Sequence, residues 1–180
     1  MIFVIVWFIA AFFTKRTAEY STSFWRIVWI GAIVAILASM GGKIAALDHG
    51  LAGWDFVWPY TPALGLAADA ITALGLFITV WARFTLGSNW SGTVTFKENH
   101  ELITKGPYAF VRHPIYTGLL LMLVGTVLIN GHALGFAVLA LGTLMLWLKL
   151  RDEERLMTKH FPDAYPAYKA RVKALVPFVL

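Results

Sequence analysis

Residues 115–150 read IYTGLLLMLVGTVLINGHALGFAVLALGTLMLWLKL, two apolar runs joined by an Asn-Gly-His turn at 130–132. A helix that spans a bilayer needs about 20 apolar residues, with a range of roughly 17–25. The run Ala133–Leu150 has that length, and the run Ile115–Ile129 reaches it if its helix begins near His113. Because the connection is so short, the two runs are predicted to form an antiparallel helical hairpin in the membrane.

The whole chain has the composition of an integral membrane protein. It has 180 residues, of which 59% are hydrophobic and 14% charged, whereas soluble proteins carry roughly 25% charged residues. Further apolar runs cover Met1–Phe13, Phe24–Met40 and Pro62–Leu86. The chain lacks cysteine, which excludes thiolate catalysis and cysteine-ligated zinc, and its five histidines show no paired spacing for a metal. The expected fold class is therefore all-α integral membrane, with five transmembrane helices and no metal.

The distribution of basic residues predicts the orientation of these helices. If five helices alternate, 14 of the 15 lysines and arginines fall in the segments 14–26, 83–113 and 149–180. The positive-inside rule then places the N-terminus outside and the C-terminus in the cytoplasm. The basic residues are not interleaved with stacking aromatics, so the expected partners are membrane lipids and not nucleic acid. We treat 1–180 as a single membrane domain, with three N-terminal helices in 1–86 and the functional half in 87–180.

The densest group of candidate functional residues is the stretch 106–118, GPYAFVRHPIYTG. Pro114 suits the first turn of a helix, where free backbone N–H groups and the helix dipole favour a bound anion. Arg112 and His113 add donors at the same point, and Gly118 would leave room for a flat ligand beside Tyr116. The alternative is that Arg112 and His113 only anchor the helix to lipid headgroups.

A second polar group follows the last apolar run, with the sequence KLRDEER at 149–155. It could be an ordinary solvated helix with i,i+4 pairs such as Lys149–Glu153. However, the hairpin brings it to the same membrane face as the stretch 106–118, which favours a joint site. Adjacent helical residues point about 100° apart, so one of Glu153 and Glu154 can face the neighbouring helix while the other faces water.

Several motifs in this half of the chain occur in the order typical of one enzyme family. They are Leu86–Ser91, His100–Ile103, Gly106–Tyr108, Arg112–Gly118, and a tail with Glu153, Glu154, Phe161, Tyr165, Tyr168, Arg171, Val172 and Pro177. Over about residues 86–178 the chain resembles the isoprenylcysteine carboxyl methyltransferase family.

The resemblance implies an S-adenosyl-L-methionine-dependent methyltransferase with a lipophilic acceptor that enters from the bilayer, such as a prenylcysteine-like carboxylate. Other acceptors left open are phospholipids and small thiols or amines. A sterol-reductase-like NADPH enzyme and a non-catalytic membrane subunit are alternatives of other classes. The implied catalytic residues are Lys149, Arg151 and Glu154, with the site facing the cytoplasm. The implied cofactor-binding residues are His100, Glu101, Leu102, Ile103, Gly106, Tyr108, Arg112, His113, Pro114, Ile115, Tyr116, Gly118 and Glu153.

Overall fold

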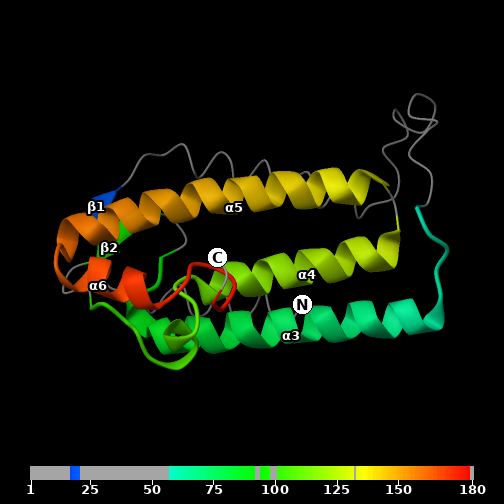
Figure 1. The fold of residues 1–180 in the computed structure, drawn as a ribbon, viewed down its shortest axis with the longest axis horizontal. Coiled ribbons are helices and arrows are strands. Elements are labelled where there is room, and N and C mark those ends of the chain that lie inside the picture. The colour runs from blue at the N-terminus through cyan, green and yellow to red at the C-terminus, as the bar shows by residue number, and fades with distance from the viewer. Residues whose placement is uncertain (1–16, 21–56, 92–93, 98–100, 132, 179–180) are drawn as a thin grey trace.

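Three long helices run side by side in the computed structural model, which describes residues 17–20, 57–91, 94–97, 101–131 and 133–178 (Figure 1). The long helices are α3 (Pro62–Leu86), α4 (Pro114–Asn130) and α5 (Ala133–His160). The shorter elements are the 3₁₀ turns η1 (Gly87–Asn89) and η2 (Gly106–Ala109), helix α6 (Ala164–Arg171), and strands β1 (Thr17–Tyr20) and β2 (Thr95–Lys97). The predicted runs Met1–Phe13 and Phe24–Met40 lie outside the described residues, so the count of five helices stays a prediction.

Helix α3 has the bounds of the predicted apolar run. Thr61 caps its start by accepting a hydrogen bond from the N–H of Leu64 at 3.2 Å, and Pro62 occupies the first turn. Gly87 ends it with a positive φ of 57°. Among the described residues, only the helical stretch Pro62–Asn89 is both long and apolar enough to span a bilayer, and Pro114–Ile129 forms a shorter apolar helix.

Helices α3 and α4 are packed closely through small residues. A Cβ atom added to Gly75 would lie 2.5 Å from the carbonyl oxygen of Gly118, and one added to Gly118 would overlap Thr79 Oγ1. Such small-residue contacts allow two helix backbones to approach each other in a membrane. The expectation that Gly118 leaves room for a ligand is therefore wrong, because helix α3 fills that space.

The predicted hairpin between α4 and α5 is confirmed. Gly131 ends α4 in the left-handed conformation (φ 65°, ψ 4°), with its N–H bonded to Val127 O at 3.0 Å, and α5 begins at Ala133. A glycine suits this position because a side chain strains left-handed backbone. The two helices lie side by side in Figure 1, so the start of α4 and the later part of α5 are at the same end of the bundle.

Beyond its apolar run, α5 continues to His160, and the chain then folds back through α6 toward the start of α4. The segment 172–175 docks there, with Lys173 O and Ala174 O accepting hydrogen bonds from the N–H groups of Arg112 (2.8 Å) and His113 (3.0 Å). Leu175 O accepts from Thr117 Oγ1 at 2.7 Å. The C-terminal tail thus covers the first turn of α4.

One short pair of strands is the exception to the all-α prediction. Strand β1 pairs antiparallel with β2, with Thr17 opposite Lys97 and Tyr20 opposite Thr95. The periodicity of so few residues does not distinguish a strand from a loop, which is why hydropathy did not reveal this pair.

Candidate functional site

Four polar side chains from two helices meet where α4 begins and the apolar run of α5 ends. His113 and Tyr116 come from the start of α4, and Lys149 and Glu153 from α5. Tyr116 donates its hydroxyl hydrogen to Glu153 Oε1 at 2.5 Å. Lys149 Nζ lies 3.9 Å from the same oxygen, and His113 Nδ1 lies 3.6 Å from Glu153 Oε2. We call these four residues the Glu153 cluster; the predicted convergence of the two polar stretches is confirmed.

Aromatic rings form one wall of the Glu153 cluster. The rings of His113 and Tyr116 are stacked, with centroids 5.5 Å apart and planes within 2° of parallel. Lys149 Nζ lies 5.4 Å from the centroid of the Tyr116 ring, within the range of a cation–π contact. Lys149 is only 4% exposed, whereas the side chain of Glu153 remains 25% exposed. The carboxylate is thus the accessible polar group of the cluster.

The charges in the Glu153 cluster stabilise one another. Burial acts to raise the pKa of Glu153, but His113, Lys149 and the Tyr116 hydroxyl outweigh it and hold that pKa below its ordinary value. Burial acts to lower the pKa of His113, but Glu153 and Glu154 outweigh it and raise that pKa above its ordinary value. A carboxylate and a protonated imidazole are therefore favoured side by side.

A second group of ionic contacts surrounds Glu154. Arg112 donates to Glu154 Oε1 from Nε (2.8 Å) and Nη2 (2.6 Å), and Lys169 Nζ of α6 lies 2.6 Å from Oε2. The side chains of Arg112 and Glu154 are each 8% exposed. Burial would raise the pKa of Glu154, but His113, Lys169 and Arg112 bring it down to about 2. We call Arg112, Glu154 and Lys169 the Glu154 triad.

The Glu154 triad corrects two expectations. Glu154 does not face water, because α6 supplies a cation on the side that the sequence left open to solvent. The sequence predicts that Arg112 offers donors to a ligand. Its guanidinium is instead bonded within the chain, since it also donates to the carbonyl oxygens of Val172 and Lys169. The geometry gives Glu154 and Arg112 a role in holding the C-terminal tail against α4.

The predicted anion site at the first turn of α4 is also partly covered. The backbone N–H groups of Arg112 and His113 bond to carbonyl groups of the tail, and those of Tyr116 and Thr117 both bond to His113 O. Pro114 is fully buried at this point. These four backbone N–H groups are therefore already bonded within the chain and are not free for an anion.

The loop before α4 contributes Tyr108 to the same region. Tyr108 is 7% exposed, its hydroxyl lies 3.5 Å from Ala82 O of α3, and its carbonyl accepts a hydrogen bond from Tyr168 at 2.6 Å. Burial and the nearby Glu153 carboxylate raise the pKa of Tyr108. Gly106 starts η2 with a φ of 60°, and Ile115 packs against the core around Tyr116. Residues 101–103 precede η2 without regular structure, and His100 lies outside the described residues.

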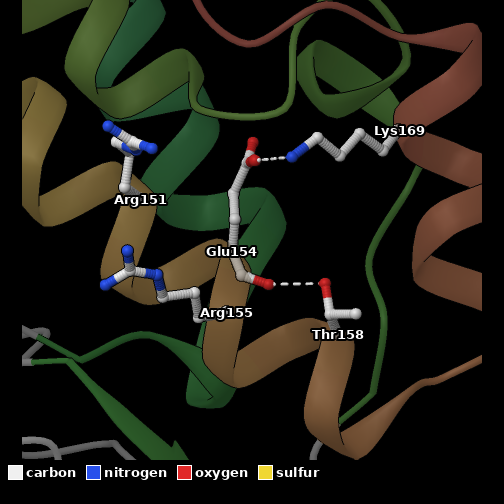
Figure 2. A pocket seen from close by; sticks show the side chains of 5 residues that line it. All are labelled: Arg151, Glu154, Arg155, Thr158 and Lys169. Atoms are coloured by element: carbon white, nitrogen blue, oxygen red, sulfur yellow. Dashed lines mark hydrogen bonds and ion pairs between the residues drawn. The ribbon is translucent and has the colours of Figure 1, made fainter.

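Arg151 follows Lys149 by two residues on α5, so the two side chains leave the helix in different directions. Arg151 is exposed and lines a cavity of about 350 Å³ together with Glu154, Arg155, Thr158 and Lys169 (Figure 2). Arg151 therefore lines a different part of the surface from the Glu153 cluster, and the catalytic role that the resemblance implies for it stays a prediction. Lys169 carries little signal in the sequence, being only a basic residue four positions after Tyr165 on a short helix.

Known proteins resemble this chain over much of its length. The phospholipid methyltransferase family model matches residues 64–164. The chain is 29% identical over 170 residues to the protein-S-isoprenylcysteine O-methyltransferase of Schizosaccharomyces pombe, covering 87% of this chain and 68% of that protein. It is 35% identical over 105 residues to the human protein of the same name, covering 54% of this chain and 36% of that protein.

Two further similarities concern a bacterial protein and a solved structure. The cobalt-zinc-cadmium resistance protein CzcN of Cupriavidus metallidurans is 29% identical over 153 residues, covering 83% of this chain and 62% of that protein. A structure of the eukaryotic intramembrane Ras methyltransferase, isoprenylcysteine carboxyl methyltransferase, shares the fold with a TM-score of 0.61 and 22% identity, covering 90% of this chain and 55% of that one. The chain thus spans about two thirds or less of the length of these relatives. It belongs to the phospholipid methyltransferase family, among relatives of the isoprenylcysteine carboxyl methyltransferases that its motifs resemble.

Proposed function

We propose that this protein is an integral membrane methyltransferase that transfers a methyl group from S-adenosyl-L-methionine to a lipophilic acceptor entering from the bilayer. The observation that carries this proposal is the Glu153 cluster, in which a carboxylate, stacked aromatic rings and an amine from two helices share one point. Its place at the end of the apolar run of α5 suits a donor from the cytoplasm and an acceptor from the membrane. The basic bias of the sequence supports the cytoplasmic side.

The side chains present fit S-adenosyl-L-methionine. Lys149 Nζ lies 5.4 Å from the centroid of the Tyr116 ring, so this ring is placed to contact a cation, and the rings of Tyr108 and Tyr116 would together offer aromatic surface to the sulfonium. The exposed part of Glu153 would hold hydroxyl or amino groups of the cofactor, with Tyr108 and residues 100–103 completing the site as the family resemblance implies. S-adenosyl-L-methionine, when bound, supplies an activated methyl group, so the protein mainly has to position the reactants and exclude water.

Lys149 is the residue that we assign to the acceptor. It is 4% exposed, and an ammonium group shielded from water attracts an anion strongly. A carboxylate of the prenylcysteine type would pair with Lys149 and requires no base, because an ionised carboxylate is itself the nucleophile. The burial of Lys149 would also keep water away from the reacting atoms. Lys149 thus favours an anionic acceptor over a neutral one.

The proposal is tested with the purified full chain in neutral detergent. Calorimetry should show that S-adenosylhomocysteine binds and that NADPH does not. With a labelled methyl donor, N-acetyl-S-farnesylcysteine should yield a base-labile methyl ester, whereas Lys149→Met should reduce the rate mainly through a higher acceptor KM. Lys159→Met, an exposed lysine on the same helix, is the matched control. Binding of NADPH alone would refute a methyltransferase.

A phospholipid is the second candidate acceptor, because the matching family model carries that name. Phosphatidylethanolamine in the same assay separates the two, since an N-methylated lipid is stable to base. Labelled phosphatidylethanolamine without labelled ester would retain the methyltransferase and overturn the carboxylate acceptor.

A further inference from the structure

A cavity lies between α5 and α6, and none of its lining residues belongs to the Glu153 cluster. Its lining residues are Arg151, Glu154, Arg155, Thr158 and Lys169, and its volume is about 350 Å³. Figure 2 shows the two arginines on α5 on one side, Lys169 reaching in from α6 on the other, and Glu154 between them. A volume of this size lies within the range of small-molecule sites, roughly 300–1,000 Å³.

The wall of this cavity carries excess positive charge. Its one carboxylate, Glu154, is already neutralised by Arg112, which lies outside the lining, and it also binds Lys169 at 2.6 Å. Arg155 lies 3.2 Å from Asp152, but their side chains are 75% and 31% exposed. An ion pair in water is worth little. Arg151, Arg155 and Lys169 together therefore favour an anionic ligand.

The position of the cavity along α5 points to the lipid headgroups. Arg151 directly follows Leu150, the last residue of the apolar run. The polar zone on each side of a bilayer is roughly 5–8 Å thick, from the difference between its total and hydrocarbon thickness. Arg155 lies about 6 Å farther along the helix at 1.5 Å per residue. If the apolar run spans the hydrocarbon core, both arginines lie at the depth of the phosphates.

We propose that this cavity binds the phosphate of an anionic phospholipid headgroup, with the guanidinium groups of Arg151 and Arg155 as its donors. Guanidinium matches phosphate oxygens with paired hydrogen bonds, and Lys169 adds charge from α6. The bound headgroup would hold the extension of α5 and helix α6 against the membrane surface. None of its lining residues belongs to the Glu153 cluster, and the proposal does not depend on the proposed methyl transfer.

The test measures the melting temperature of the purified full chain in neutral detergent by tryptophan fluorescence. The additives are dioctanoyl phosphatidylglycerol, dioctanoyl phosphatidylcholine and inorganic phosphate. We expect phosphatidylglycerol alone to raise the melting temperature, with a saturable dependence on concentration. The double variant Arg151→Gln/Arg155→Gln should weaken its apparent affinity by about ten- to a hundred-fold, from the loss of charged hydrogen bonds.

Lys159→Gln removes the same charge next to Thr158, at a residue that does not line the cavity, and should leave the affinity unchanged. Both arginines are exposed, so the double variant should keep its melting temperature without lipid. An equal response to phosphatidylcholine, an equal response to inorganic phosphate, or an unchanged affinity in the double variant would each overturn the proposal. Because binding of S-adenosylhomocysteine is measured in the same samples, failure of the lipid site is distinguishable from failure of the methyltransferase.

Discussion

Replacing each of the adjacent glutamates on α5 by glutamine should have different consequences, although the chemical change is the same. Glu153 is 25% exposed and belongs to the Glu153 cluster, whereas Glu154 is 8% exposed and holds Arg112 and Lys169. We therefore expect Glu153→Gln to weaken binding of the cofactor and Glu154→Gln to destabilise the fold. Activity should fall far more in Glu153→Gln when both are compared below their melting temperatures.

The loss of stability expected in Glu154→Gln follows from the buried partner of Glu154, Arg112. Removing one member of a buried ion pair costs about 3–5 kcal/mol, because the other charge is left uncompensated. Glutamine keeps one acceptor oxygen for Arg112, and Lys169 is 52% exposed, so the lower end of about 3 kcal/mol applies. For a chain of this length that free energy corresponds to a melting temperature lower by about 10 °C.

The weaker cofactor binding expected in Glu153→Gln follows from the loss of one hydrogen bond between a charged group and the cofactor. Such a bond contributes about 1.5–3 kcal/mol, so the Kd for S-adenosylhomocysteine should rise about ten- to a hundred-fold. Titration calorimetry gives the Kd and tryptophan fluorescence gives the melting temperature of each variant. Asp152→Asn, which removes a charge from a half-buried residue on the same helix, should change neither.

The pH dependence of the melting temperature gives a second measure of how much the Glu154 triad stabilises the fold. The pKa of Glu154 is lowered in the folded protein from an ordinary 4.5 to about 2. Its ionised form therefore stabilises the fold fully above about pH 4.5, and this contribution is lost as the pH falls toward 2. The melting temperatures of the wild type and of Glu154→Gln should differ most near neutral pH and converge in acid. If Glu154→Gln melts normally but loses the cofactor, while Glu153→Gln keeps it, the roles that we assign are exchanged.

Three further predictions concern topology, the aromatic wall and helix packing. Single cysteines at Ser91 and Thr158, introduced into a chain that has none, should resist an impermeant thiol reagent in intact cells and react after permeabilisation; labelling from outside would contradict the orientation. Tyr116→Phe removes the hydroxyl that donates to the carboxylate 2.5 Å away, and should raise the Kd for S-adenosylhomocysteine about three- to ten-fold without changing the melting temperature by more than a few degrees. Gly118→Ala should lower the melting temperature by about 5 °C, since its methyl group would overlap Thr79 and overpacking costs about 1–3 kcal/mol; an unchanged value would contradict the close approach of α3 and α4.

Local features of the sequence predicted the positions of the three long helices. The apolar run Pro62–Leu86 became α3, and the runs on either side of the turn at 130–132 became α4 and the first part of α5. Hydropathy and a glycine in the left-handed conformation act within a few residues, so they are visible without tertiary structure. The short turn also determined which ends of the hairpin meet, and thereby the convergence of Tyr116 with Glu153.

The contacts of the C-terminal tail were decided only by the tertiary structure. A helical wheel places Glu153 and Glu154 about 100° apart and predicts that one faces water. Instead, α6 folds back and brings Lys169 to Glu154, while Lys173 and Ala174 bond to the start of α4. These partners are far apart in the chain and follow no periodic pattern. Which charge is buried, and which stays accessible to a ligand, therefore depends on packing between distant segments.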